Sequence, residues 1–468
     1  MPAMPTTTFA RSCDFRRRDF LKAGVAGMVT AGSAVSLFGE SEVRLPVRRD
    51  LVISKIERMT VRVPYRPAPA RNMARELPHW MYSEIVKVHL NSGFVGVGET
   101  LLYYTWGVTR DEDVKRAVGK NAAELMWDDE LGAGLQMALF DAVGKASDVP
   151  AHRLLGQQVH DQTPLSWWNI DTTPEDMAAE CQEAYRQGYM AYKTKGRPWF
   201  DIWNQMDQSV KGLPSDFKID MDFNDTLLDA KRGIPILKRL AGYPQIDIYE
   251  SPIFQDDIRG NQAIRKATRV AVAMHYGNPK PVVAIRNSIC DGFVIGGGAS
   301  GLMRSAHVAA AADLKFWLQL VGTGITAAWS LHFGAVCSHA RWPAVNCHQL
   351  YQHSLLKDPI QVKKGYARIP EKPGLGIEID WGAVDRYRVG KPEKRPDPKR
   401  LVETSWPNGD RMYFNHLGGV NFVLNPAREG KVPYYVDGAR TRLYSDDGSE
   451  KWQGLYERTK KGPLLVNG

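Results

Sequence analysis

The chain has 468 residues, 43% hydrophobic and 24% charged, a globular composition that excludes a disordered or fibrous protein. This length allows two or three domains, or one large barrel with an accessory unit. Lys and Arg number 61 against 52 Asp and Glu, and this net charge of +9 is mild for the size. No Lys- or Arg-rich run resembles a nucleic-acid arm, so we expect no nucleic-acid partner. The five cysteines form neither a CxxC pair nor a disulfide framework.

The first 50 residues have the features of an export signal followed by a linker. Residues 16–22 read Arg-Arg-Arg-Asp-Phe-Leu-Lys and precede an apolar stretch at 23–37, the order of a twin-arginine signal. The alternative is a membrane-spanning helix, but the stretch is shorter than the roughly 20 residues that cross a bilayer. We therefore expect a periplasmic or extracellular protein with no stable transmembrane helix in the mature chain. A retained signal would tether it to the membrane.

The first part of the body predicts a small mixed domain. A strand is expected at 55–64, and a strand pair at 83–90 and 93–99 is joined by the turn Asn91-Ser92-Gly93. Helical segments follow to about residue 155.

Strand and helix patterns alternate after residue 163. Thr173 and Pro174 fit the N-cap and first position of a helix at 173–187, and another helix is expected at 226–241. Alternation of this kind indicates a parallel sheet, and seven or eight units favour closure into a barrel. The apolar runs lie at 165–170, 190–195, 217–222, 246–251, 270–275, 292–296 and 316–321, with a weaker one at 344–347.

Chemically useful side chains stand where the predicted strands end. Lys193 and Lys195 end the second strand two positions apart, so they face the same way. Asp222, Glu250 and His275 end the next three strands. Because the active site of a parallel barrel lies at the carboxyl ends of its strands, these groups are expected to meet. Carboxylates suit Mg²⁺, and the imidazole admits Mn²⁺, Fe²⁺ or Zn²⁺.

Several short motifs together resemble the enolase superfamily, in its mandelate racemase and muconate-lactonizing branch. The resemblance implies a modified TIM barrel of the (β/α)7β type at 161–359, with an α+β capping domain at 51–160 that residues 360–390 complete. Residues 391–468 lie outside it as an extension whose role the sequence does not indicate. The motifs are GVGET at 96–100, ALFDAVGK at 138–145, LLG at 154–156, KTK at 193–195, DFN at 222–224, ESP at 250–252 and PGLGIEID at 373–380.

The resemblance implies removal of a proton next to a carboxylate, with a divalent ion stabilising the enediolate. Lys195 would be the base, and Lys193 would lower its pKa and touch the carboxylate. Asp222, Glu250 and His275 would hold the ion, which is expected to be Mg²⁺, or Mn²⁺ or another transition metal because of His275. The partners implied are a small-molecule carboxylate substrate and further copies of the chain in a homo-oligomer.

The sequence departs from the family pattern at several positions. His275 stands where the family has Glu or Asp. The sixth strand ends without a Lys, the seventh offers Gln319 rather than a His, and near the eighth Asn346 replaces a Glu, with His348 close by as a candidate acid. Because one base cannot easily racemise, we predict a lyase that dehydrates a carbohydrate acid. The alternatives are a racemase or epimerase, and a non-catalytic sugar-acid-binding protein.

Other polar and aromatic residues are expected to touch the substrate. Each assignment has a structural alternative: the lysines could be surface charges, the two carboxylates could cap helices, and His275 could bind substrate or pack. A glycine run at 296–298 resembles a phosphate loop, but a structural turn is preferred. The expected substrate contacts are Arg75, Trp168, Asn224, Gln319 and Asn346.

Overall fold

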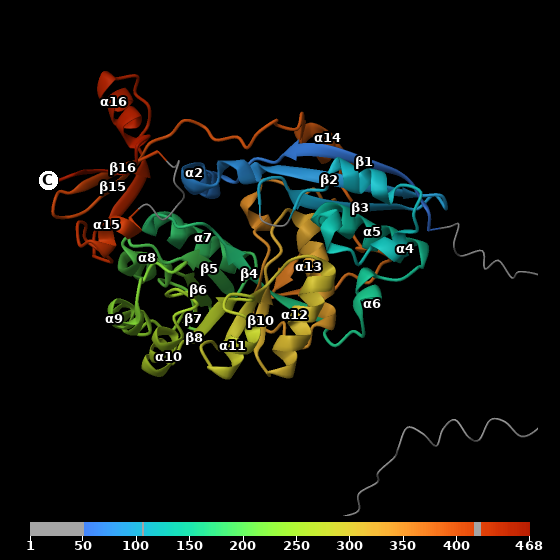
Figure 1. The fold of residues 1–468 in the computed structure, drawn as a ribbon, viewed down its shortest axis with the longest axis horizontal. Helices are drawn as coiled ribbons and strands as arrows, with labels where there is room; N and C mark the ends of the chain where they lie inside the picture. Colours follow the sequence, from blue (N-terminus) through green and yellow to red (C-terminus); the bar gives the residue numbers. More distant parts are fainter. Residues whose placement is uncertain (1–50, 105–106, 416–422) are drawn as a thin grey trace, which may run out of the picture. The chain divides into compact units, whose positions relative to one another are not determined.

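The structure is a computed structural model, and it describes residues 51–104, 107–415 and 423–468 (Figure 1). The predicted export signal lies outside these residues. Within them, no helix is both long enough and apolar enough to cross a bilayer.

Eight parallel strands form a closed barrel, with one helix in each of the seven connections. β11 pairs with β4, and a bridge between Gln319 and Val345 joins β11 to the end of β10. The (β/α)7β barrel expected from the sequence is therefore confirmed. The strands are β4 (Gln162–Trp168), β5 (Ala191–Lys195), β6 (Lys218–Asp222), β7 (Ile246–Glu250), β8 (Ala271–His275), β9 (Gly292–Ile295), β10 (Lys315–Leu318) and β11 (Ala344–Val345). The helices are α7 (Pro174–Arg186), α8 (Ile202–Ser209), α9 (Ala230–Leu240), α10 (Ile258–Ala267), α11 (Pro281–Arg286), α12 (Ala299–Ala311) and α13 (Gly324–Val336).

Local signals explain where two of these helices begin. α7 starts as predicted, because Thr173 Oγ1 accepts a hydrogen bond from Asp176 N at 3.2 Å. α9 begins at residue 230 rather than at 226. Asp225 and Leu228 adopt left-handed backbone angles, with φ of 66° and 67°, so the chain makes a loop there before Asp229 caps the helix.

A four-stranded antiparallel sheet in the order β14-β1-β2-β3, with α5 packed on it, forms a cap above the barrel (Figure 1). Gly96 and Gly98 of β3 lie directly against α5: a Cβ added at either would stand 2.0 Å from Ala138 O or 2.1 Å from Gly134 O. The glycines of this motif are therefore required by close packing. The elements of this region are β1 (Ile53–Arg62), α2 (Pro67–Glu76), η1 (Pro78–Met81), β2 (Tyr82–Leu90), β3 (Val95–Leu101), α3 (Asp111–Ala117), α4 (Ala122–Leu125), η2 (Asp129–Leu131), α5 (Ala133–Ala146), α6 (Ala151–Leu155), α14 (Trp381–Tyr387) and β14 (Arg388–Val389).

A buried carboxylate connects the cap to the barrel. Glu99 accepts hydrogen bonds from Ser83 Oγ at 2.9 Å, from Thr323 N at 3.0 Å and from Thr326 Oγ1 at 2.9 Å. Thr323 and Thr326 lie at the N-terminus of α13, where unpaired amide groups favour a negative charge. The acidic residue of the 96–100 motif thus holds the cap on a barrel helix.

The chain after the barrel first returns to β4 and then to the cap. A short hairpin of β12 (Val362–Lys363) and β13 (Tyr366–Arg368) pairs with β4, next to which η3 (His348–Leu350) lies. In the following motif, Leu375 N donates to Asp141 Oδ1 of α5 at 2.7 Å. Val97 N and Lys145 Nζ donate to Asp141 Oδ2 at 2.8 and 2.6 Å, so one carboxylate joins three separate motifs.

The described residues of the extension, 391–415 and 423–468, form a sheet in the order β17-β15-β16-β18 with two helices (red in Figure 1). Trp406 and Met412 of the extension share a hydrophobic cluster with Trp199 and Phe200 of the loop after β5. Thr441 Oγ1 donates to Trp199 O at 2.6 Å. The extension therefore packs on the loop that follows the lysine pair. Its elements are β15 (Val402–Ser405), β16 (Arg411–Phe414), α15 (Leu424–Arg428), β17 (Arg440–Leu443), α16 (Glu450–Thr459) and β18 (Leu464–Val466).

Candidate active site

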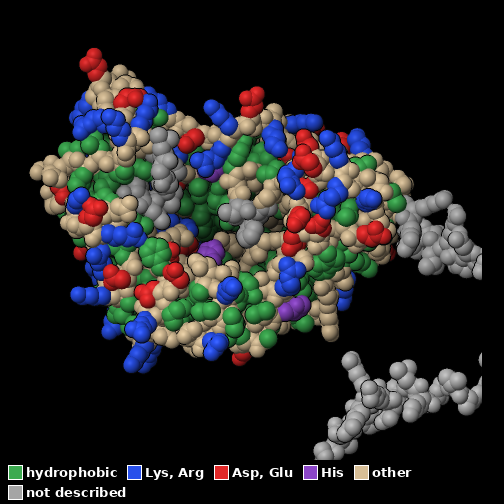
Figure 2. All heavy atoms as spheres, viewed as in Figure 1, with side chains coloured by type: hydrophobic (Ala, Val, Ile, Leu, Met, Phe, Trp, Pro, Cys, Tyr) green, Lys and Arg blue, Asp and Glu red, His purple; other side chains and the backbone are tan. Residues whose placement is uncertain are grey.

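A cavity of about 380 Å³ lies between the carboxyl ends of the barrel strands and the cap. Figure 2 shows the surface hollowed below the cap, with hydrophobic side chains inside the hollow. The polar side chains that the barrel contributes are Lys193, Lys195, Arg197, Asp222, Asn224 and His275, together with Gln319. The cap contributes Glu76, Trp80 and Tyr104.

Two lysines and two carboxylates meet at the floor of this cavity. Lys195 Nζ lies 2.5 Å from Asp222 Oδ2 and donates to Asn224 Oδ1 at 2.9 Å. Lys193 Nζ contacts Glu250 Oε2, lies 3.8 Å from Asp222 Oδ2 and donates to Gln319 Oε1 at 3.1 Å. Strand register explains this proximity, because Lys195 is paired with Asp222 and Asp222 with Glu250 across β5, β6 and β7.

Burial makes these charges depend on one another. The side chains of Lys193 and Asp222 are only 2% and 1% exposed. Burial disfavours the charge on each, but the opposite charges outweigh it: the pKa of Lys193 lies above the ordinary lysine value, and the pKa of Asp222 lies well below that of a free Asp. The Lys193 amine is therefore held as an ammonium ion beside these carboxylates.

The structure places Arg75 away from the cavity lining. Its guanidinium is buried, with Nη2 3.5 Å from Asp171 Oδ2, and it lies over the ring of Phe200 at 4.9 Å. The expected substrate contact is therefore corrected: the charge of Arg75 is used by a neighbouring carboxylate.

Two further expected site residues are not part of the cavity lining. Val345 and Cys347 line the cavity, but β11 ends at Val345, and His348 begins η3 after a left-handed turn at Cys347. Asn346 Nδ2 donates to Leu320 O at 2.9 Å, and His348 Nε2 lies 3.0 Å from Tyr189 OH. Neither residue lines the cavity, and the expected acid is not at the site.

Two aromatic residues and one arginine complete the walls. Trp168 lines the cavity as expected and stacks on Trp80 at 5.8 Å between ring centroids. Arg197, which sequence analysis missed, donates to Asn224 Oδ1 at 2.7 Å. The alternation of Lys193, Lys195 and Arg197 along the chain is the signal that could have identified it.

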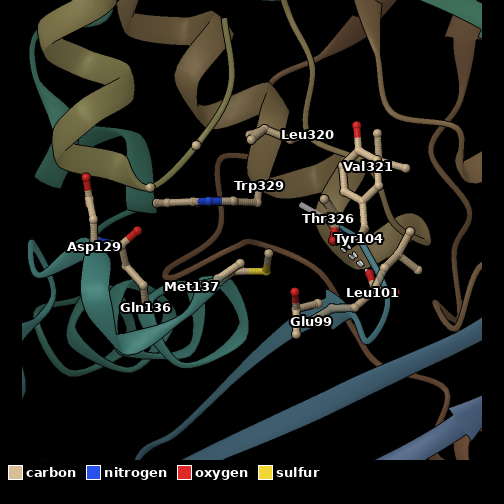
Figure 3. A pocket seen from close by; sticks show the side chains of 14 residues that line it. Glu99, Leu101, Tyr104, Asp129, Gln136, Met137, Leu320, Val321, Thr326 and Trp329 are labelled. Carbon is tan, nitrogen blue, oxygen red and sulfur yellow. Dashed lines mark hydrogen bonds between the residues drawn. The ribbon is translucent and has the colours of Figure 1, made fainter. Parts of the chain in front are cut away.

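The glycine run at 296–298 is a structural turn. Asp129 occupies the N-terminus of α12, accepting from Ser300 N at 2.9 Å and from Gly301 N at 2.7 Å. A Cβ on Gly298 would stand 2.5 Å from Asp129 Cγ. Figure 3 shows Asp129 beside a smaller cavity between cap and barrel, with Met137 and Trp329 also in its lining.

Comparison with known proteins identifies the family. The family described as enolase C-terminal domain-like matches residues 176–383. N-succinyl-L-Arg/Lys racemase of Bacillus cereus is 23% identical over 342 residues, which cover 66% of this chain and 91% of that protein. D-galactonate dehydratase of Variovorax paradoxus is 23% identical over 364 residues, which cover 69% and 94%. A crystal structure of muconate cycloisomerase from Pseudomonas fluorescens superposes with a TM-score of 0.59 at 18% identity, covering 73% of this chain and 99% of that one.

Residues 176–383 of the chain thus match the enolase C-terminal domain-like family. The resemblance and the fold expected from the motifs are both confirmed. Because these relatives include a racemase, a cycloisomerase and a dehydratase, the match by itself does not select the reaction.

Enolase superfamily proteins use a divalent metal ion, typically Mg²⁺, and bind small carboxylate substrates. Asp222 and Glu250 supply carboxylate oxygens of the kind such an ion prefers, and His275 Nε2 lies 2.9 Å from Glu250 Oε1. Within the described residues no three His, Cys, Asp or Glu side chains form a group arranged to hold an ion. The Lys193 ammonium contacts both carboxylates instead. The oxygen and nitrogen atoms of Asp222, Glu250 and His275 thus fit a divalent ion. In this structure the lysines compensate the negative charge of the two carboxylates.

The partly buried position of His348, whose Nδ1 is enclosed, predicts a pH effect on stability. Burial lowers the pKa of His348 from 6.5 to about 4, so the folded protein keeps it neutral while the unfolded chain takes up a proton below pH 6.5. Its contribution to stability is therefore lost as pH falls from about 6.5 to 4. We expect His348→Gln to reduce the difference in unfolding free energy between pH 7 and pH 5 by about 2 kcal/mol, measured by urea denaturation. An unchanged difference would show that His348 titrates as a solvated histidine.

Proposed function

We propose that the protein is a metal-dependent lyase that removes the proton α to the carboxylate of a carbohydrate acid and eliminates the β-hydroxyl as water. The observation that carries this proposal is the cluster at one end of the barrel in which the Lys195 amine contacts Asp222 and the Lys193 amine contacts Asp222 and Glu250. Among the described residues that line the cavity, β9 and β10 contribute no amine or imidazole opposite this pair. One base favours elimination over racemisation, which needs a second acid–base group.

Lys195 is the base in this proposal, because its side chain is 13% exposed at the cavity wall while that of Lys193 is only 2% exposed. The ammonium of Lys193, oriented by Gln319, is placed to bind a substrate carboxylate. A divalent ion held by Asp222, Glu250 and His275 would supply stabilisation of negative charge on that carboxylate. When the two protein carboxylates are shared with another cation, repulsion between the neighbouring ammonium groups favours the neutral amine at Lys195.

The walls of the cavity support an acid sugar as the substrate class. Arg197 adds a third cation to the lysine pair, which suits an anion. The stacked Trp80 and Trp168 offer an apolar aromatic surface of the kind that packs against sugar carbons. One relative acts on such a compound, as its name D-galactonate dehydratase states.

We also propose that the chain is exported by the twin-arginine pathway and works as a homo-oligomer in the periplasm or outside the cell. The sequence of residues 16–37 supports export. Replacing Arg17 and Arg18 together by Lys is expected to retain a folded reporter, fused behind residues 1–50, in the cytoplasm. Export of the doubly substituted fusion at the unsubstituted level would exclude this pathway.

Lys195→Met is expected to abolish exchange of the α proton. The purified protein is incubated with sugar acids in D₂O and Mn²⁺ or Mg²⁺, and deuterium incorporation and 2-keto product are followed by NMR and mass spectrometry. Wild type should give both, and the variant should lose both by at least about 100-fold because base catalysis contributes this much. Lys315→Met, at an exposed lysine, is the matched control.

The outcomes separate the candidate functions. Exchange with inversion but without 2-keto product indicates an epimerase, and binding without exchange indicates a sugar-acid-binding protein. Undiminished exchange in the Lys195→Met protein would exclude Lys195 as the base.

The third ligand position predicts the choice of metal. With two carboxylates and one imidazole, wild type is expected to bind Mn²⁺ more tightly than Mg²⁺ by at least about tenfold. His275→Asp should narrow this ratio, because a third carboxylate suits a hard ion. Isothermal titration calorimetry of the metal-free proteins measures the affinities for Mn²⁺ and for Mg²⁺. His307→Asp on α12 serves as the control. An unchanged ratio in the His275→Asp protein would remove His275 from the metal site.

A further inference from the structure

Elimination of water requires a proton for the departing hydroxyl, and the cap offers a group for it. Glu76, the last residue of α2, is 4% exposed and lines the cavity together with Lys195. It thus faces the cavity from the cap, whereas the base lies on the barrel. His348, the acid expected from the sequence, is not part of the lining.

Arg75 lies between the Glu76 carboxyl and a second buried carboxyl, that of Asp171: its Nε is 3.5 Å from Glu76 Oε1, and its Nη2 is 3.5 Å from Asp171 Oδ2. Glu76 Oε2 and Asp171 Oδ1 are both buried, and within the described part of the chain no N–H or O–H group donates to either. Burial of carboxylate oxygens without a donor disfavours the ionised form, and one arginine beside two buried carboxyls compensates a single negative charge. This arrangement favours one proton on the pair.

The surroundings decide which carboxyl carries this proton. Trp199 Nε1 donates to Asp171 Oδ2 at 2.6 Å, and Arg75 Nη2 lies 3.5 Å from the same oxygen. Glu76 has fewer contacts with donors and positive charge: its Oε1 lies 3.5 Å from Arg75 Nε. Burial and the neighbouring Asp171 charge raise the pKa of Glu76 well above its usual value, whereas for Asp171 the charges of Arg75 and Arg197 outweigh burial and lower the pKa. Of the two carboxyls, Glu76 is thus the one that favours the protonated form.

A chain of contacts relates Glu76 to the base. Arg197, whose charge acts on both carboxyls of the pair, donates to Asn224 Oδ1 at 2.7 Å. The same oxygen accepts from Lys195 Nζ at 2.9 Å. Glu76 and Lys195 therefore border one continuous polar wall of the cavity.

We propose that Glu76 is the general acid that protonates the departing β-hydroxyl; this inference rests on the proposed dehydration. Lys195 Nζ takes the α proton, and the electron pair of the Cα–H bond passes to the carboxylate as an enediolate. That pair then forms the Cα–Cβ double bond while the Cβ–O bond breaks and the hydroxyl leaves with the Glu76 proton as water. The enol product tautomerises to the 2-keto acid, the Lys195 ammonium returns its proton to solvent, and the Glu76 carboxylate regains one.

The extension positions this acid. Arg400 Nε donates to Arg75 O at 3.0 Å, next to Glu76 at the end of α2. Thr441 Oγ1 holds Trp199, whose indole orients Asp171. Residues 391–468 thus fix both halves of the carboxyl pair, although none of the described residues of the extension lines the cavity.

Glu76→Gln separates the two half-reactions. In D₂O the variant should retain α-deuterium incorporation within about threefold of wild type, while formation of the 2-keto acid falls at least about 100-fold, the usual contribution of an acid. Glu76→Asp should recover part of the dehydration, and Glu371→Gln, at an exposed carboxyl, should change neither rate. A defect in folding would lower both rates together, and a positioning role alone would not change their ratio.

Either an unchanged ratio of dehydration to exchange, or dehydration within threefold of wild type, would overturn the assignment. A second measurement is independent of substrate: the infrared spectrum of the wild-type protein at pH 7 should contain a protonated carboxyl band that Glu76→Gln removes. Absence of exchange in wild type would refute the proposed function itself, and the acid role with it. Exchange without the expected ratio would refute only the acid role.

Discussion

The site depends on charge compensation between groups that are almost completely removed from water. Asp222 and Glu250 are each 1% exposed, and a buried carboxylate is tolerated only beside a positive charge. The two lysines supply that charge in this structure, so their protonation depends on what else the carboxylates contact.

The rest of the molecule keeps these groups in register. Parallel pairing of β5, β6 and β7 brings the lysines and carboxylates side by side, and Glu99 fixes the cap to the first turn of α13. The extension then holds the end of α2 and the loop after β5. Three regions that are distant in sequence thus form the walls of one cavity.

The sequence predicted the barrel well because the carboxyl ends of consecutive parallel strands must meet, and their spacing is visible in the chain. Lys193, Lys195, Asp222, Glu250 and His275 were located in this way, and all five border or contact the same charged cluster. The eighth strand is only two residues long, so the sequence did not show which residues near it line the cavity. The chain leaves this strand after Val345 and turns at Cys347, so the expected acid His348 lies in η3 and not in the cavity lining.

Composition, strand spacing and motif order by themselves determined the fold class and the residues at the strand ends, because periodicity and topology are local properties of a chain. Only the tertiary structure decided how Arg75 and Glu76 are used, because their chemistry depends on Asp171 and Trp199, which lie roughly 100 residues away in sequence. The protonation of a buried carboxyl depends on its surroundings. Here three segments that are distant in sequence form those surroundings, and no local sequence pattern connects them.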